Sequence, residues 1–217
     1  MWKPIEWISP KEIERHSMEI IEREMPPCNF SPEELAVVKR CIHTSADFDY
    51  VHNLYFSPDA VSRALEVLKK GPVIVTDTNM AAAGINKKAL KRLGGTVCCF
   101  MAEEKVAEEA KIRGITRAAV SMEWAAKLEG PVFYAIGNAP TALLRLYEMI
   151  QEGQVKPAFI IGAPVGFVNV KEAKERICST NIPCIVPKGR KGGSNIAAAI
   201  CNALLYQIKS DKDTDKG

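Results

Sequence analysis

Short runs of apolar residues recur along the chain from residue 72 onward. Each run holds four or five residues, is rich in β-branched or aromatic side chains, and follows a glycine or a proline. Runs of this kind are typical of strands that are buried on both faces of a sheet. The five predicted strands cover residues 72–76, 96–100, 132–136, 158–162 and 184–187.

Helical periodicity fills the intervals between these runs. The amphipathic stretches cover residues 86–93, 103–112, 116–128, 141–151, 169–177 and 195–208. Because strands and helices alternate at this spacing, the pattern predicts a mainly parallel sheet with helices on both sides.

The residues before the first predicted strand are mostly helical in pattern. Ser31 is followed by Pro32 and Glu34, the signature of a capping box at a helix start. A second helix is expected to open at 57–59 and to end at 69–71. We therefore expect an α/β protein of three layers, α/β/α, with a mainly parallel sheet of about five strands and an N-terminal helical segment. One domain covers residues 1–209, and the polar tail 210–217 is expected to be disordered.

Charge and cysteine content limit the classes of function. The 29 basic and 26 acidic residues leave a net charge of +3, too small and too evenly spread to favour nucleic acid. The seven cysteines are odd in number and form no C-x-x-C pair, which favours free thiols in a reducing compartment. The N-terminus has no signal-peptide pattern, and no apolar stretch approaches the roughly 18 to 20 residues that span a bilayer. We expect a cytoplasmic protein without a membrane partner.

The segments that follow the predicted strands are the first place to seek a ligand site. In open parallel sheets, ligands bind beyond the carboxyl ends of the strands. Four of the five strands lead into loops rich in glycine, proline or polar residues, whose backbone N–H groups can hold an anion where a helix begins. The candidate binding residues in these loops are Asp77, Met80, Gly84, Asn138, Pro164, Gly166, Phe167, Arg190, Lys191, Gly192, Gly193 and Ser194.

The chemistry of these loops favours carboxylate ligands over nucleotides. The segment around Arg190 and Lys191 lacks the spacing of a phosphate-binding P-loop, and the segment 137–141 is not a dinucleotide-binding fingerprint. An arginine fork and a lysine point charge suit carboxylates. Solvated loop charges remain the alternative interpretation for both residues.

His43 is the candidate for proton transfer among the three histidines. His16 lies in a helical pattern and His52 in a polar loop, so both are expected to be structural or solvent-facing. His43 ends an amphipathic stretch and opens a small, polar segment that contains Asp47 and Asp49. Histidine exchanges protons near neutral pH, but a histidine at a helix end can also serve as a cap. From the residues alone, both interpretations stay open.

Nucleophilic and metal chemistry find little support in the sequence. No G-x-S-x-G elbow is present, and neither Ser121 nor Ser194 has an evident histidine partner. Cys41 follows the apolar rhythm of its helix, which makes it a core residue. No paired-histidine spacing indicates a metal site in the protein.

Six blocks of sequence, in order, resemble the precorrin-8X and cobalt-precorrin-8 methylmutases of cobalamin biosynthesis. The resemblance runs from about residue 5 to 208, and the segments GNAPTAL, GAPVGFV and GRKGGS are its most specific parts. The blocks are IERHSMEIIERE, RCIHTSADFDY, TDTNMAAAGI, AIGNAPTALLRL, PAFIIGAPVGFVNVKEAKE and GRKGGSNIAAAICNALL.

This resemblance implies a reaction and assigns residues to it. Members of the family move a methyl group from ring carbon 11 to carbon 12, act as homodimers with sites near the subunit interface, and use no organic cofactor. Their catalytic histidine falls on His43 here, beside Thr44. By family position, Ser17, Arg40 and Arg117 would contact the acidic arms of the corrin ring, and Met80 and Phe167 would form apolar walls. The resemblance leaves open whether the substrate, precorrin-8 or cobalt-precorrin-8, carries cobalt.

Two other classes of function compete with an isomerase. A corrinoid or tetrapyrrole carrier that binds without turnover would need the same loops but not His43. A nucleotide-binding, Rossmann-like protein would use the glycine-rich turns for phosphate.

Overall fold

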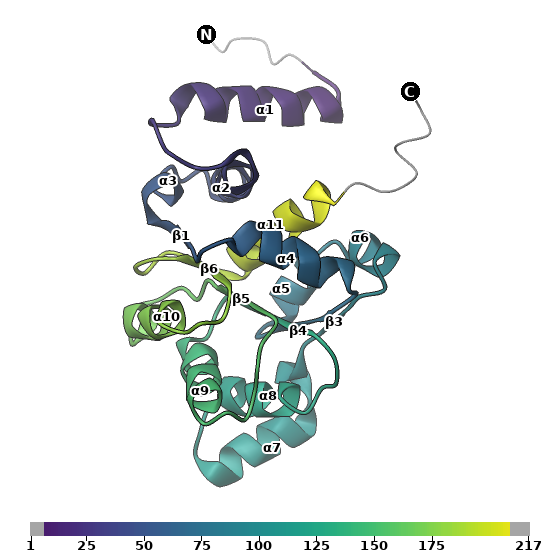
Figure 1. Ribbon diagram of the computed structural model, residues 1–217, viewed down its shortest axis with the longest axis vertical. Coiled ribbons are helices and arrows are strands. Elements are labelled where there is room, and N and C mark those ends of the chain that lie inside the picture. The colour runs from purple at the N-terminus through teal and green to yellow at the C-terminus, as the bar shows by residue number, and fades with distance from the viewer. Residues whose placement is uncertain (1–6, 209–217) are drawn as a thin grey trace.

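A six-stranded sheet forms the centre of the molecule in the computed structural model, which describes residues 7–208 (Figure 1). Its strand order is β1-β6-β5-β4-β2-β3, and neighbouring strands from β6 to β3 are parallel. The five parallel strands confirm the predicted set, with ends that differ by at most two residues. They are β2 (Val73–Thr76), β3 (Thr96–Cys98), β4 (Val132–Ile136), β5 (Phe159–Gly162) and β6 (Cys184–Pro187).

The segment before β2 is mostly helical, as predicted, but it also contains a sixth strand, β1 (Leu54–Phe56), that was not predicted. It pairs antiparallel with β6, with Tyr55 opposite Val186, and forms one edge of the sheet. The strand has only three residues and directly follows the short helix α3 (Tyr50–Asn53), which contains His52. Although Asn53 precedes it, the strand is too short to show alternation, so the sequence pattern does not reveal it.

Helices cover both faces of the sheet, which confirms the three-layer architecture (Figure 1). One face carries α2 (Pro32–Ser45), α4 (Ala60–Lys69), α5 (Asn79–Gly84), α6 (Lys87–Arg92) and α11 (Ser194–Gln207). The other carries α7 (Glu104–Arg113), α8 (Arg117–Ala125), α9 (Pro140–Gln151) and α10 (Val170–Cys178), with the short 3-10 helix η1 (Phe100–Ala102). The helix α1 (Pro10–Glu24) packs on α2, on the side away from the sheet (Figure 1).

Alternation along the strands divides the core into two layers. Ile74 and Phe133 point into the layer under α11, whereas Val75 and Tyr134, one residue later, point into the layer under α8 and α9. The rings of Phe133 and Phe159 stack with centroids 4.9 Å apart. Successive side chains of a strand point to opposite faces of the sheet. The apolar strands therefore contribute to the hydrophobic core on both faces.

The helix starts follow the signals in the sequence. Ser31 and Glu34 form the predicted capping box of α2, and Ser9 and Glu12 form a second one at α1. Helix α4 ends at Lys69, and Gly71 follows with a φ of 66°, a backbone conformation that glycine adopts without strain. None of the helices in residues 7–208 combines the length and apolar composition needed to cross a bilayer.

Candidate functional site

Asp77 organises the loops at the carboxyl ends of β2 and β4. Its two carboxylate oxygens accept backbone hydrogen bonds from Gly137 at 2.8 Å, Asn138 at 2.8 Å and Ala139 at 2.6 Å. The side chain is fully buried, and burial raises the pKa of the carboxyl group while the three N–H donors oppose that shift. Although the sequence predicts Asp77 as a ligand contact, the structure gives its oxygens to the protein backbone.

Close backbone approach joins the start of α11 to the same loops. The hydroxyl groups of Thr78 and Ser194 are 2.7 Å apart. A Cβ atom on Gly137 would lie 2.6 Å from the Cα of Ser194, so only glycine fits there. The carboxyl end of β4 and the N-terminus of α11 therefore lie against each other.

The loops after β5 and β6 form a single unit. The N–H of Gly193 donates to the carbonyl of Ala163 at 2.8 Å, and the N–H of Gly166 donates to the carbonyl of Arg190 at 3.2 Å. A Cβ on Gly192 would lie 2.3 Å from the same Ala163 oxygen. Glycine at 192 is thus required for the two loops to meet.

His43 lies in the last turn of α2, at a corner that is bonded to the loop after β6. The ammonium group of Lys191 is 2.6 Å from an oxygen of Asp47 and 2.5 Å from an oxygen of Asp49. The N–H of Lys188 donates to the carbonyl of Asn53 at 2.7 Å. The histidine corner and the strand-end loops, distant in sequence, are therefore neighbours in the fold.

The surroundings of His43 argue against a capping role. The helix is closed by Ala46, whose φ of 56° is left-handed and whose N–H donates to the carbonyl of Ile42 at 2.7 Å. The His43 side chain is exposed, and within residues 7–208 no hydrogen bond holds its imidazole. Cys41 is buried in the core, where desolvation raises the pKa of its thiol, as expected for a structural residue. The imidazole is therefore available to a ligand.

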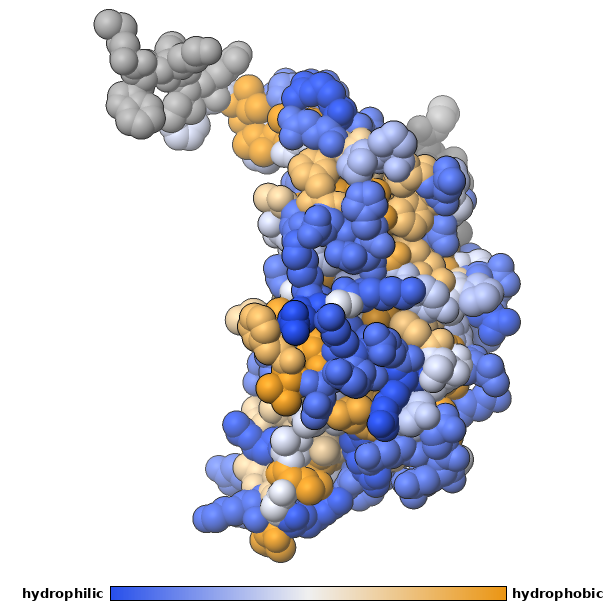
Figure 2. Space-filling model, turned by 90° about the vertical axis from the view of Figure 1, so that its left-hand side faces the viewer, coloured by the Kyte–Doolittle hydropathy of each residue, from blue (hydrophilic) through white to orange (hydrophobic). Residues whose placement is uncertain are grey.

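Large apolar side chains stand exposed beside these loops. Phe167 is 84% exposed and Met80 is 71% exposed, and Val165 and Val168 accompany them. The guanidinium of Arg190 lies over the Phe167 ring, 5.6 Å from its centroid. Figure 2 shows apolar surface gathered midway down one side of the molecule, bordered by hydrophilic residues. Such a mixture suits a ligand with a flat apolar body and charged edges.

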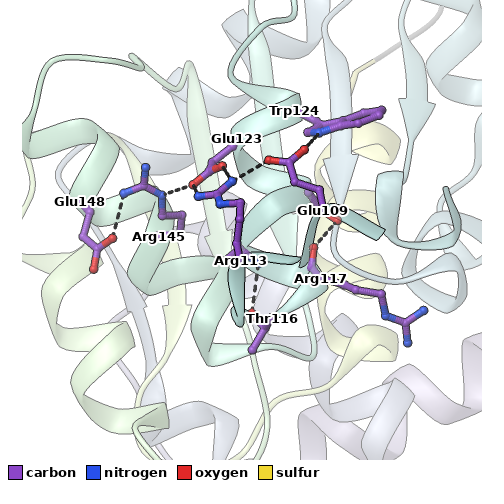
Figure 3. Close-up of polar contacts among 10 residues, drawn as sticks. Glu109, Arg113, Thr116, Arg117, Glu123, Trp124, Arg145 and Glu148 are labelled. Carbon is purple, nitrogen blue, oxygen red and sulfur yellow. Dashed lines mark hydrogen bonds and ion pairs between the residues drawn. The ribbon is translucent and has the colours of Figure 1, made fainter. Parts of the chain in front are cut away.

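Arg117 is an exposed cation at the start of α8. Nearby, Arg113 and Arg145 share Glu123 at 2.5 and 2.7 Å, and Figure 3 shows the Arg117 side chain extending away from this cluster. In the described part of the chain, no carboxylate pairs with Arg117. The hydroxyl of Thr116 donates to that of Thr141 at 2.9 Å, which places this arginine beside the loop that follows β4.

Ser17 and Arg40 lie apart from the strand-end loops. Arg40 pairs with Glu14 of α1 at 3.1 Å and lies over the Tyr206 ring, 5.5 Å from its centroid. The hydroxyl of Ser17 donates to the carbonyl of Ile13 in its own helix. Arg40 lines a groove of about 680 Å³ between α1 and α2. Within one chain, these two residues therefore lie on α1 and α2, and only Arg40 lines the groove between the two helices.

The predicted site residues fall into three sets. Eight are exposed and can reach a ligand: His43, Thr44, Met80, Gly84, Arg117, Asn138, Phe167 and Arg190. Ser17 and Arg40 lie on α1 and α2, apart from the strand-end loops. The other seven shape the loops. Asp77, Pro164, Gly193 and Ser194 are buried, Gly166 and Gly192 are half-buried, and the ammonium of Lys191 is held by two aspartates.

Two features of the candidate site could not be predicted from the sequence: the pairing of Asp49 with Lys191 and the burial of Lys174. The pairing of Asp49 with Lys191 spans 142 residues, which no local pattern reveals. Lys174 is buried, although its helical stretch resembles a charged surface helix. Among residues 7–208, no three His, Cys, Asp or Glu side chains are grouped as metal ligands would be.

Comparison with known proteins gives a consistent result. The sequence model of the precorrin-8X methylmutase family matches residues 12–207. The cobalt-precorrin-8 methylmutase of Priestia megaterium is 40% identical over 203 residues, covering 94% of this chain and 90% of that protein. The cobalt-precorrin-8 methylmutase of Leptospira interrogans is 44% identical, covering 90% and 92%. The crystal structure of the precorrin-8X methylmutase of Thermus thermophilus superposes with a TM-score of 0.83 at 40% identity, covering 90% of this chain and 95% of that one.

Proposed function

This chain belongs to the precorrin-8X methylmutase family, and we propose that its own substrate is precorrin-8 or cobalt-precorrin-8. It is an isomerase of cobalamin biosynthesis that catalyses a methyl migration on the corrin ring. The methyl group moves from carbon 11 to carbon 12, and the product is hydrogenobyrinic acid or cobyrinic acid. Cobalt, where present, arrives as part of the substrate.

His43 acts as the general acid and base of this reaction. A 1,5-sigmatropic methyl shift needs no nucleophile and no redox partner, but it needs the ring in one tautomer and in one orientation. An imidazole can donate a proton to the ring and recover it afterwards. The observation that carries this assignment is the exposed His43, whose imidazole makes no hydrogen bond within residues 7–208, at a corner that Lys191 joins to the strand-end loops.

The strand-end loops hold the acidic arms of the ring. Arg117 and Arg190 supply exposed guanidinium groups, and Asn138 an exposed amide, near the edge where the five parallel strands end. Arginine binds carboxylates through two parallel hydrogen bonds. Met80 and Phe167 provide the apolar surface for the ring itself. The proposed binding surface thus combines charged groups for the acidic arms with apolar side chains for the ring.

The active form is a homodimer in the cytoplasm. Ser17 lies on α1 and Arg40 lines the α1–α2 groove, and both would reach a ring only if this part of one subunit faces the loops of the other. Ile13 and Ile20 of α1 are exposed and would be covered by that contact. The seven free thiols suit a reducing compartment. Light scattering should give twice the mass of 23.9 kDa, and a monomer would remove this part of the proposal; cell fractionation checks the compartment.

Conversion of the substrate tests the proposed function. Purified protein is incubated with metal-free precorrin-8 and, separately, with cobalt-precorrin-8, and the absorbance spectrum is followed. We expect the product spectrum to develop with at least one of them. A carrier would bind both without any spectral progress, and titration calorimetry that shows binding of nucleotides but not of hydrogenobyrinic acid would favour the Rossmann-like alternative.

A further inference from the structure

Lys174 is a buried lysine that the proposed reaction does not use. Its side chain is 1% exposed, on the face of α10 that also buries Ala173 and Ile177. In the described residues, no carboxylate pairs with it, and burial lowers the pKa of its amine to about 8. Burying an amine without a counter-charge is unfavourable. We therefore expect a lysine at this position to have a specific role.

The amine of Lys174 grips the loop that follows β6. It donates to the carbonyl oxygen of Gly189 at 2.9 Å and to that of Lys191 at 2.7 Å. These two carbonyls flank Arg190, the cation proposed to hold an acidic arm of the ring. One buried amine therefore sets the path of the backbone on both sides of this arginine.

Lys191 connects the loop after β6 to the corner that follows His43, where Asp47 and Asp49 lie. Its carbonyl oxygen accepts a hydrogen bond from Lys174, and its ammonium group pairs with Asp47 and Asp49. The N–H of Asp49 donates to Asp47 at 3.0 Å, and the N–H of Asp47 donates to Ser45, the last residue of α2, at 3.2 Å. The corner that begins two residues after His43 is thus compact and anchored.

We propose that Lys174 is the positioning residue of the active site, acting through Lys191 to hold both the substrate loop and the His43 corner. The proposal rests on the proposed function for its kinetic readout. The two lysines lie in series: Lys174 orders the loop, and Lys191, placed by that loop, fixes the corner. A buried lysine that no carboxylate of residues 7–208 pairs with is thereby explained, because only a long side chain with several N–H donors reaches both carbonyls.

Replacing Lys174 by methionine tests the first step, since methionine keeps the packing and removes the donors. We expect KM for the converted substrate to rise about tenfold and kcat to fall about ten- to hundredfold. The matched control is Lys171→Met, an exposed lysine of the same helix, for which both constants should stay near wild type. A merely structural role would reduce the amount of active protein and leave KM unchanged.

Replacing Lys191 by methionine tests the second step. Because its ammonium faces Asp47 and Asp49, we expect kcat to fall while KM changes by less than about threefold. The double variant should be no worse than Lys174→Met alone, because the two lysines act in series. Losses that multiply in the double variant, or an unchanged KM in Lys174→Met, would overturn the proposal.

Two further measurements keep the test decisive. If Lys174→Met does not fold, Lys174→Gln, which keeps an N–H donor on a shorter side chain, should show a smaller rise in KM, and no rise would count against the proposal. If the wild-type protein converts neither precorrin-8 nor cobalt-precorrin-8, the proposed function fails separately. Hydrogen exchange then decides: amides of residues 189–193 should exchange faster in Lys174→Met than in Lys171→Met, and equal rates would overturn the positioning role.

Discussion

Replacing His43 by alanine should lower kcat by about 100- to 10,000-fold, the range that a positioned general acid or base contributes. The loss should fall on kcat, because the imidazole serves proton transfer and the ring is held by the loops. Affinity for the product, hydrogenobyrinic acid, should change by less than about threefold, since the exposed His43 makes no hydrogen bond that shapes the described structure. Turnover assays measure kcat, and titration calorimetry measures the affinity for the product.

His52 provides the matched control for this variant. It lies in α3, on the same corner, and is also exposed. We expect His52→Ala to keep wild-type turnover. Equal losses in the two variants would mean that the corner tolerates no alanine, and full turnover in His43→Ala would remove His43 from the mechanism.

Replacing Gly192 by alanine should disrupt the joined loops after β5 and β6. The new Cβ would lie 2.3 Å from the carbonyl oxygen of Ala163 and 2.6 Å from that of Pro164, both backbone atoms that cannot rotate away. Overpacking of this kind costs about 1–3 kcal/mol, which lowers Tm by about 3 to 10 °C for a chain of this size. Because the loop must move, product affinity should fall at least about tenfold.

Gly189→Ala separates the collision from the general effect of alanine in this loop. Gly189 has a φ of 78°, and an added Cβ there meets no atom within 4 Å. Backbone strain alone should cost about 1 kcal/mol, with product affinity near wild type. If Gly192→Ala binds the product as tightly as Gly189→Ala does, the two loops do not form the binding surface.

The layers of the fold could be predicted because the pattern of the sequence is strong there. Strands such as Val132–Ile136 are apolar throughout and bounded by turn residues, which only a sheet covered on both faces explains. The strand Leu54–Phe56 could not be predicted, because three residues carry no period. Its place at the edge of the sheet depends on pairing with β6, a contact between distant parts of the chain.

As with the fold, only part of the candidate site could be predicted from the sequence. The strand-end loops could be proposed as a ligand site from their residue types, and His43 as the catalytic residue from the family resemblance. The role of Asp77 could not, because a carboxylate after a strand suits a ligand as well as it suits the three backbone N–H groups that it binds. Lys174 was concealed by its helix, whose other charged residues are exposed, so its burial follows only from tertiary packing.

The structure of the protein with hydrogenobyrinic acid bound would show whether His43 and the strand-end loops form the active site. We expect the corrin ring against Phe167 and Met80, its arms on Arg117 and Arg190, and the His43 imidazole roughly 2.6–3.2 Å from a proton-bearing atom of the ring. A ring bound elsewhere, for example only in the α1–α2 groove of one subunit, with His43 of both subunits remote from it, would rule out this active site.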